Sequence, residues 1–140
     1  MLNNNSAQRD LVHSKTLFRF SKLTDKLLRK LEQSEKMGKV ISKSLASLDQ
    51  SQEGLACMTI RNGLLAMNLG YLKASDAIPR LLDVVSRSES QKVEQEFITY
   101  SKDTPTWVFL RWIGQLVAVI NRNESSIIAE KIRQLARKYP

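Results

Sequence analysis

The chain has 140 residues, a formal net charge of +8 at pH 7 and a 42% hydrophobic content, which together fit one globular domain of ordinary composition. One cysteine, Cys57, excludes an internal disulfide framework, and with a single histidine the chain cannot form a Cys/His zinc site. No apolar run reaches the ~18 residues of a membrane span, so we expect no membrane partner.

The N-terminal part predicts one long helix after a short tail. Residues 1–6 are polar and are expected to be disordered. From about Ala7 to about Gln33, the spacing of apolar and charged residues predicts an amphipathic helix. We expect its buried face to consist of Phe20, Leu23, Leu27 and Leu31. Five basic residues fall on a different face: Lys15, Arg19, Lys22, Lys26 and Lys30.

Two further helices with a loop between them are predicted before residue 70. A short helical pattern covers residues 40–48, and the polar stretch 49–54 is typical of a loop. A denser apolar segment from Leu55 to Leu69 then predicts a helix. Gly70 is well placed to follow the end of that helix in a left-handed conformation.

The next two helices are marked by their start signals and apolar spacing. Ser75 or Asp76 is expected to cap the first of them, with Pro79 in the first turn, where a missing N–H costs little. Its predicted buried stripe is Ile78, Leu81, Leu82 and Val85. Another helix follows, with Val93, Phe97 and Ile98 as its apolar residues.

The last two predicted helices begin after Thr104. The Thr104-Pro105 pair indicates a helix start with the proline at the first helical position. This helix continues to Ile120 and is apolar around most of its circumference, so we expect neighbours to bury it on several sides. A final helix carries Ile127, Ile128, Ile132 and Leu135.

These elements define the expected fold class as all-α, with about seven helices and no strand. Helix pairs would recur about every 35–40 residues, which is the range of TPR- or HEAT-like α-solenoids. Residues 7–140 would then form one helical-repeat segment. Since a repeat buries its apolar faces only against its neighbours, we expect the end helices to expose apolar surface.

Three motifs in the C-terminal half resemble a known family. They are Pro79-Arg80-Leu81-Leu82, the pattern Pro105-x-Trp107-x-Phe109-x-x-Trp112-Ile113, and Tyr139-Pro140. The stretch from about Leu64 to Pro140 resembles the C-terminal part of the FAT region of phosphatidylinositol-kinase-related protein kinases. The upstream sequence LFRFSKLTDKLLRKLEQ is compatible with an earlier helix of that region.

The resemblance implies a non-catalytic scaffold of paired helices within a much larger parent chain. Its partners would be the neighbouring helical repeats and the kinase domain of that parent. Within the family, the chain is most similar to the nuclear serine/threonine kinase that acts with the Ku heterodimer at DNA ends, in double-strand break repair by non-homologous end joining. The family continues past the tyrosine-proline step into the kinase domain, so we interpret the chain as a fragment or a truncated product.

Catalytic motifs of a kinase are not found in the sequence. It has no G-x-G-x-x-G, H-R-D or D-F-G pattern, so we expect no catalysis and no cofactor in this chain. His13 and Cys57 could form a nucleophile pair, but a surface histidine and a core cysteine are the favoured interpretation. Trp107 and Trp112 could stack on bases, but we expect them in the core.

The basic residues of the first helix offer an alternative function. Lys15, Arg19, Lys22, Lys26 and Lys30 could follow a phosphate backbone, which would make the chain a freestanding module that binds nucleic acid or a protein partner. A lysine-rich helix face is more often simply solvated. In an intact solenoid the same face could meet an acidic neighbouring repeat.

Overall fold

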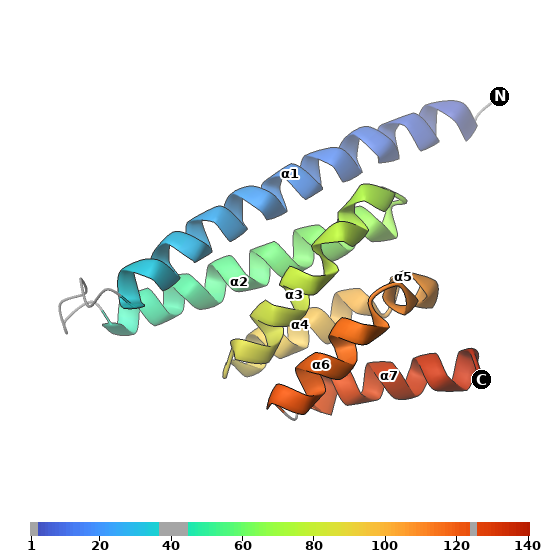
Figure 1. The fold of residues 1–140 in the computed structure, drawn as a ribbon. Helices are drawn as coiled ribbons and strands as arrows, with labels where there is room; N and C mark the ends of the chain where they lie inside the picture. Colours follow the sequence, from blue (N-terminus) through green and yellow to red (C-terminus); the bar gives the residue numbers. More distant parts are fainter. Residues whose placement is uncertain (1–2, 37–44, 124–125) are drawn as a thin grey trace.

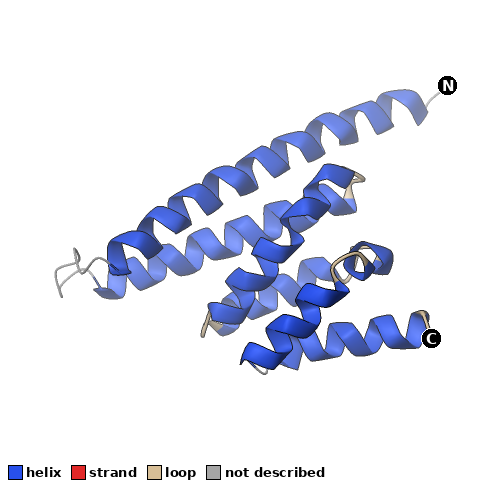
Figure 2. Cartoon of the chain, viewed as in Figure 1, coloured by secondary structure: helices blue, strands red, loops and turns tan. Residues whose placement is uncertain are grey.

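The computed structural model describes residues 3–36, 45–123 and 126–140 (Figure 1). Every regular element within these ranges is a helix, and none is a strand (Figure 2). The expected all-α fold is therefore confirmed. The elements are α1 (Asn3–Lys36), α2 (Leu45–Asn68), the 3-10 helix η2 (Leu72–Ala77), α3 (Ile78–Arg87), α4 (Gln91–Ser101), α5 (Thr106–Leu110), α6 (Ile113–Asn123) and α7 (Ser126–Lys138).

Three antiparallel helical hairpins are stacked along the chain: α1 with α2, α3 with α4, and α6 with α7 (Figure 1). Helix α2 packs on α4, and α3 packs on α6. Helices α3 and α6 begin 35 residues apart, and so do α4 and α7. The predicted repeat length is thus confirmed for the second and third hairpins, while the first hairpin has longer helices.

The core runs through the stack between the hairpins. Its largest fully buried apolar side chains come from α2, α3, α4, α5, α6 and α7: Ile60, Leu64, Ile78, Leu81, Leu82, Val85, Val93, Phe97, Phe109, Leu116 and Ile128. The whole predicted stripe of α3 is among them, because α3 lies between α2 and α6. Burial of such side chains stabilises each by ~1.5–3 kcal/mol relative to exposure.

Helix α1 extends beyond its predicted ends and buries a different face. It begins at Asn3, so residues 3–6 belong to the helix rather than to the expected disordered tail. Adding a residue to an existing helix gains one hydrogen bond per residue fixed, which favours this extension. The expectation that Phe20, Leu23 and Leu27 form the buried face was wrong, because they are 52%, 53% and 44% exposed.

Helix α2 contains the stretch that the sequence suggested was a loop. Residues 49–54 are helical, and the predicted pattern at 40–48 falls mainly outside the described residues. Tertiary contacts stabilise the helical conformation here, since Glu53 accepts a hydrogen bond from Ser90 Oγ at 2.6 Å. The end of α2 was predicted correctly: Gly70 has φ 93°, and its N–H donates to the carbonyl of Met67.

The start of α3 differs from the expected cap. Ser75 and Asp76 lie within η2, which runs directly into α3, and Ala77 occupies the cap position. Ser75 Oγ instead donates to the carbonyl of Leu72 at 2.7 Å. Pro79 lies in the first turn, as predicted.

The apolar segment after Thr104 is two helices rather than one. The chain turns at Arg111 and Trp112, so that α5 packs on α7 while α6 packs on α3. Trp112 is half-buried, and its Nε1 donates to the carbonyl of Ser75 at 3.0 Å. The expected burial of Trp107 in the core was wrong, because this side chain is 52% exposed.

The start of α5 also differs from the predicted one. Helix α5 begins at Thr106, with Pro105 at the cap position. Thr104 is buried and does not cap it, since its Oγ1 donates to Asn68 Oδ1 at 2.6 Å. The Thr104 hydroxyl therefore bonds to α2 instead of capping the helix that follows it.

Candidate interaction surface on the first helix

The five basic residues predicted as an interaction face do lie together on α1. Lys15, Arg19, Lys22, Lys26 and Lys30, which we call the basic stripe, are all exposed. Lys22 Nζ lies 4.8 Å from the centre of the Phe18 ring. None of the five forms an ion pair with any residue of the described ranges. Their charges are thus available to a partner or to water.

An exposed apolar seam runs beside the basic stripe. It consists of Val12, Phe20, Leu23 and Leu27, which are 44% to 61% exposed, and we call it the outer seam. At 3.6 residues per turn, its centre lies roughly 90° around the helix from the centre of the basic stripe. The outward half of α1 is therefore apolar along one line and positively charged along the next.

The inward half of α1 carries small hydroxyl side chains together with the buried Phe18 and Leu28. Ser14, Ser21 and Leu28 recur every seven residues and are buried against α2. Ser21 Oγ donates to the carbonyl of Thr59 at 2.7 Å, and the hydroxyls of Thr24 and Thr59 are 2.8 Å apart. The exposed Phe20 and Leu27 show the same seven-residue spacing, so this recurrence alone could not have identified the packed face from the sequence.

A glycine allows the close approach of α1, α2 and α3. An added Cβ at Gly63 would lie 3.1 Å from Ser21 Oγ and 3.2 Å from Leu81 Cδ1. Both neighbours are buried. Gly63 therefore marks a close approach between the first hairpin and α3.

An arginine on α3 fixes the rotation of α1. The Arg80 side chain is 17% exposed and forms ion pairs with Asp25 and Glu32 of α1 and with Asp83 of its own helix. Burial works against the charge of Arg80, but its hydrogen bonds to Asp25 and the nearby carboxylates raise its pKa overall. The guanidinium thus stays charged and holds α1 and α3 together.

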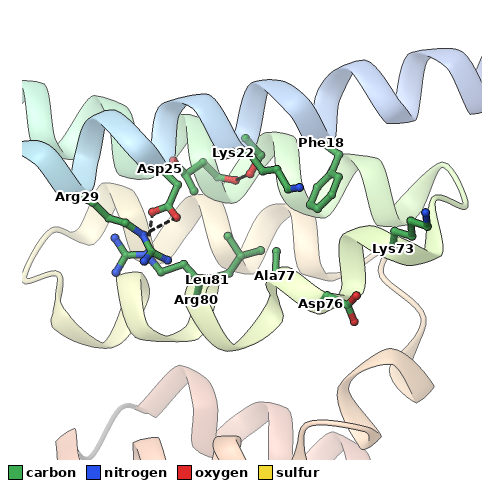
Figure 3. A pocket seen from close by; sticks show the side chains of 11 residues that line it. Phe18, Lys22, Asp25, Arg29, Lys73, Asp76, Ala77, Arg80 and Leu81 are labelled. Atoms are coloured by element: carbon green, nitrogen blue, oxygen red, sulfur yellow. Dashed lines mark hydrogen bonds and ion pairs between the residues drawn. The ribbon is translucent and has the colours of Figure 1, made fainter.

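A pocket of about 420 Å³ opens beside this cluster, between α1 and the segment from η2 to α3 (Figure 3). Arg29 and Arg80 meet at the carboxylate of Asp25, while Lys73 and Asp76 lie toward the other end (Figure 3). The two arginines are therefore already neutralised by protein carboxylates. The pocket is a groove of mixed charge rather than a preformed anion site.

Lys131 of α7 is a buried cation that the sequence did not identify. Its Nζ donates to the carbonyl of Ser101 at 3.1 Å and lies 4.6 Å from the centre of the Phe109 ring. Burial lowers its pKa from the usual value. The ammonium satisfies a carbonyl at the C-terminal end of α4, where a positive charge is favourable.

His13 and Cys57 lie where we expected them, the histidine at the surface and the cysteine in the core. His13 is exposed on α1, whereas Cys57 is buried in the core face of α2. Burial raises the pKa of the Cys57 thiol, and the negative charges of Glu96 and Glu53 raise it further. A protonated thiol is a poor nucleophile.

Part of the chain is similar to one very large enzyme from several organisms. It is 30% identical over 66 residues to the DNA-dependent protein kinase catalytic subunit of Dictyostelium discoideum, a match that covers 46% of this chain and 2% of that protein. It is 24% identical over 116 residues to the protein of the same name from Mus musculus, covering 83% of this chain and 3% of the relative. The chain therefore corresponds to a very short segment of these kinases.

The other comparisons add no family assignment. No protein-family model matches the chain. No solved structure matches it at a significant level. In the described ranges, the helices are too short or too polar to cross a membrane.

Proposed function

We propose that this chain is a non-catalytic scaffold segment of the FAT type, within a large nuclear serine/threonine kinase of the DNA-dependent protein kinase kind. The observation that carries the proposal is the similarity over 116 residues to a segment that makes up 3% of such a kinase. The stacked hairpins with a 35-residue repeat support it, because each hairpin of such an array is stabilised by its neighbours.

The exposed surface of α1 is consistent with a segment inside a longer array. Phe20, Leu23 and Leu27 form an apolar line on the first helix of the stack, where a preceding repeat would pack. At the other end α7 exposes polar residues such as Arg133 and Gln134, while α6 exposes Ile113 and Val117. The expected apolar outer face is therefore confirmed for α1 but not for α7.

In this proposal the helices transmit forces and supply no reacting group. The Arg80 ion pairs and the Lys131 contact join successive hairpins, so a displacement at one end is passed to the next hairpin. The partners are the neighbouring repeats and the kinase domain of the parent chain. The parent acts with the Ku heterodimer at DNA ends, in double-strand break repair by non-homologous end joining.

The test is the size and activity of the native protein. An antibody raised against the recombinant chain is used for immunoblotting and for precipitation from a nuclear extract. We expect a band far above the 16.0 kDa of this chain, and a precipitated kinase activity that linear DNA stimulates. A single band near 16.0 kDa, or a precipitate without DNA-stimulated kinase activity, contradicts the proposal.

The exposed basic stripe favours one second candidate, a helical module that binds nucleic acid. Binding through these charges would weaken steeply between low and moderate salt. Replacing Arg19, Lys22, Lys26 and Lys30 by Glu would abolish it. Duplex affinity that survives this replacement contradicts the second candidate.

A further inference from the structure

We propose that the outward half of α1 is the docking site for one amphipathic helix with acidic residues along one edge, supplied by a neighbouring repeat of the same longer polypeptide. This inference rests on the proposed function and specifies the partner of one surface. The outer seam would receive the apolar face of that helix, and the basic stripe would meet its acidic edge.

The spacing of the outer seam is that of a helix–helix contact. Within the seam, Phe20, Leu23 and Leu27 are separated by three and four residues, and the exposed Thr16, which is not part of the seam, lies four residues before Phe20; this is the alternation of core positions in a heptad repeat. From Val12 to Leu27 the seam is about 22 Å long at 1.5 Å per residue. A narrow line of this length fits one helix of about four turns better than it fits a broad membrane surface.

The seam cannot become buried by rotation of α1 within this chain. Ser21 and Thr24 are hydrogen-bonded to Thr59 of α2, and Asp25 is paired with Arg80 of α3. Asp25 and Ser21 lie on the side of α1 opposite to the seam, and Thr24 lies between that side and the seam. A rotation that buried Leu23 would break these contacts, so covering the seam takes a partner other than the helices of the described ranges.

The charges beside the seam define the partner's chemistry. Arg19 and Lys26 each directly precede a seam residue, at the positions that flank a helical interface and select its partner. The opposite edge carries Leu17 and Thr24, which are uncharged. An acidic edge on the incoming helix would therefore match one side of α1 and not the other.

The same charges disfavour a second copy of α1 as the partner. In an antiparallel pair, Arg19 and Lys26 would face their own equivalents, and like charges at such an interface are repulsive. In a parallel pair they would meet the edge of Leu17 and Thr24, which is uncharged and packs toward the core of its own copy. Nucleic acid would match the charges but would leave Phe20, Leu23 and Leu27 in water.

The first experiment measures peptide binding to the 140-residue chain. Three labelled helical peptides share leucine and isoleucine at their heptad core and carry Glu, Gln or Lys at every flanking position. We expect the Glu peptide to bind about tenfold tighter than the Gln peptide, with an advantage that shrinks in high salt, and the Lys peptide to bind least. Equal affinities for the Glu and Lys peptides overturn the charge argument.

Variants separate the seam from the charges. Leu23→Gln with Leu27→Gln should weaken the binding of all three peptides, while Arg19→Gln with Lys26→Gln should remove only the preference for Glu. Arg133→Gln on the exposed side of α7 is the matched control and should change neither. Because all these positions are exposed, circular dichroism should report unchanged helicity. The proposal is overturned if the chain dimerises, or if it binds vesicles or duplex DNA, and Leu23→Gln with Leu27→Gln abolishes that dimerisation or binding.

The second experiment identifies the source of the helix in the native protein. A zero-length carbodiimide reagent joins lysine amines to carboxylates in contact, and mass spectrometry of the precipitated native protein locates the products. We expect Lys22 or Lys26 joined to an Asp or Glu from another part of the same polypeptide. A product with a different protein overturns the assigned source. A native band near 16.0 kDa would instead contradict the proposed function, which the peptide assay does not test.

Discussion

The Nε atom of Arg80 on α3 donates a hydrogen bond to Oδ1 of Asp25 on α1, and the two atoms are 2.7 Å apart. The residues are 55 positions apart in the sequence. Asp25 also accepts from Arg29, and Arg80 also meets Glu32 and Asp83. This cluster of ion pairs joins the first two hairpins beside the apolar core that lies between them.

Removing the Arg80 guanidinium should destabilise the chain. Arg80→Met leaves two carboxylates of α1 poorly compensated at a half-covered site, so we expect a loss of about 1–3 kcal/mol in the free energy of unfolding. Arg87→Met is the matched control, because Arg87 is 58% exposed and among the described residues its ion pair is with Asp83 alone, and it should cost no more than about 0.5 kcal/mol. Urea unfolding followed by circular dichroism measures both. Equal losses would contradict the bridging role of Arg80.

The sequence identified α1 as a helix but not which side of it is buried. Both sides of α1 carry apolar residues, and the buried side is rich in serine and threonine. These hydroxyls can be buried at low cost because Ser14 and Thr24 donate to carbonyls of their own helix, those of Leu11 and Phe20. Only the position of α2 decides between the two sides, and local spacing does not contain that information.

The buried face or the end of a helix was predicted correctly where only one face of the helix is apolar, or where the backbone conformation favours one residue type. The stripe of α3 was found because its other side is polar, and the end of α2 was found because Gly70 needs a positive φ. Residues 49–54 are helical within α2, where Glu53 contacts Ser90, a residue 37 positions later that no local pattern can indicate. The Arg80 cluster depends on similarly distant residues, so no local pattern could indicate it.

Two helical glycines should respond differently to substitution. Gly54 has no atom within 4 Å of an added Cβ, so Gly54→Ala should raise the free energy of unfolding by about 0.5–1 kcal/mol. Gly63→Ala gains the same helix propensity but must displace Ser21 Oγ or Leu81 Cδ1, so we expect it to be less stable than Gly54→Ala. The larger side chain of Gly63→Val should lower the free energy of unfolding by about 1–3 kcal/mol. Thermal unfolding ranks the three variants. A Gly63→Ala variant as stable as Gly54→Ala would show that α1, α2 and α3 are less closely packed.

The buried Lys131 should make stability depend on alkaline pH. Burial lowers the pKa of Lys131 in the folded chain below its ordinary value of 10.5. Between the lowered pKa and 10.5 only the unfolded chain binds this proton, so the free energy of unfolding rises with pH in that window. Lys131→Met removes the dependence, whereas Lys138→Met, at an exposed position of α7, should not.

The measurement is the difference in unfolding free energy between the parent chain and each variant, from neutral pH to 10.5. Titrations common to both proteins cancel in this difference. We expect the parent chain to gain stability relative to Lys131→Met as the pH rises, and to remain parallel to Lys138→Met. A constant difference for Lys131→Met would show that the ammonium is as well solvated in the folded chain as in the unfolded one.

The reactivity of Cys57 should report the separation of α2 from α4, because the charged residues around its thiol include Glu96 and Lys92 of α4. The thiol is 8% exposed, and burial raises its pKa, so alkylation by a thiol reagent near neutral pH should be slow in the folded chain and fast in urea. The matched control is Met58→Cys combined with Cys57→Ala, because Met58 is 47% exposed on the same helix. It should react at nearly the same rate in both states, as measured by mass spectrometry over time. Rapid alkylation of Cys57 in a chain that circular dichroism shows to be folded would mean that α2 separates readily from α4, and the ion pair between Arg61 and Glu96 would then not hold these two helices together.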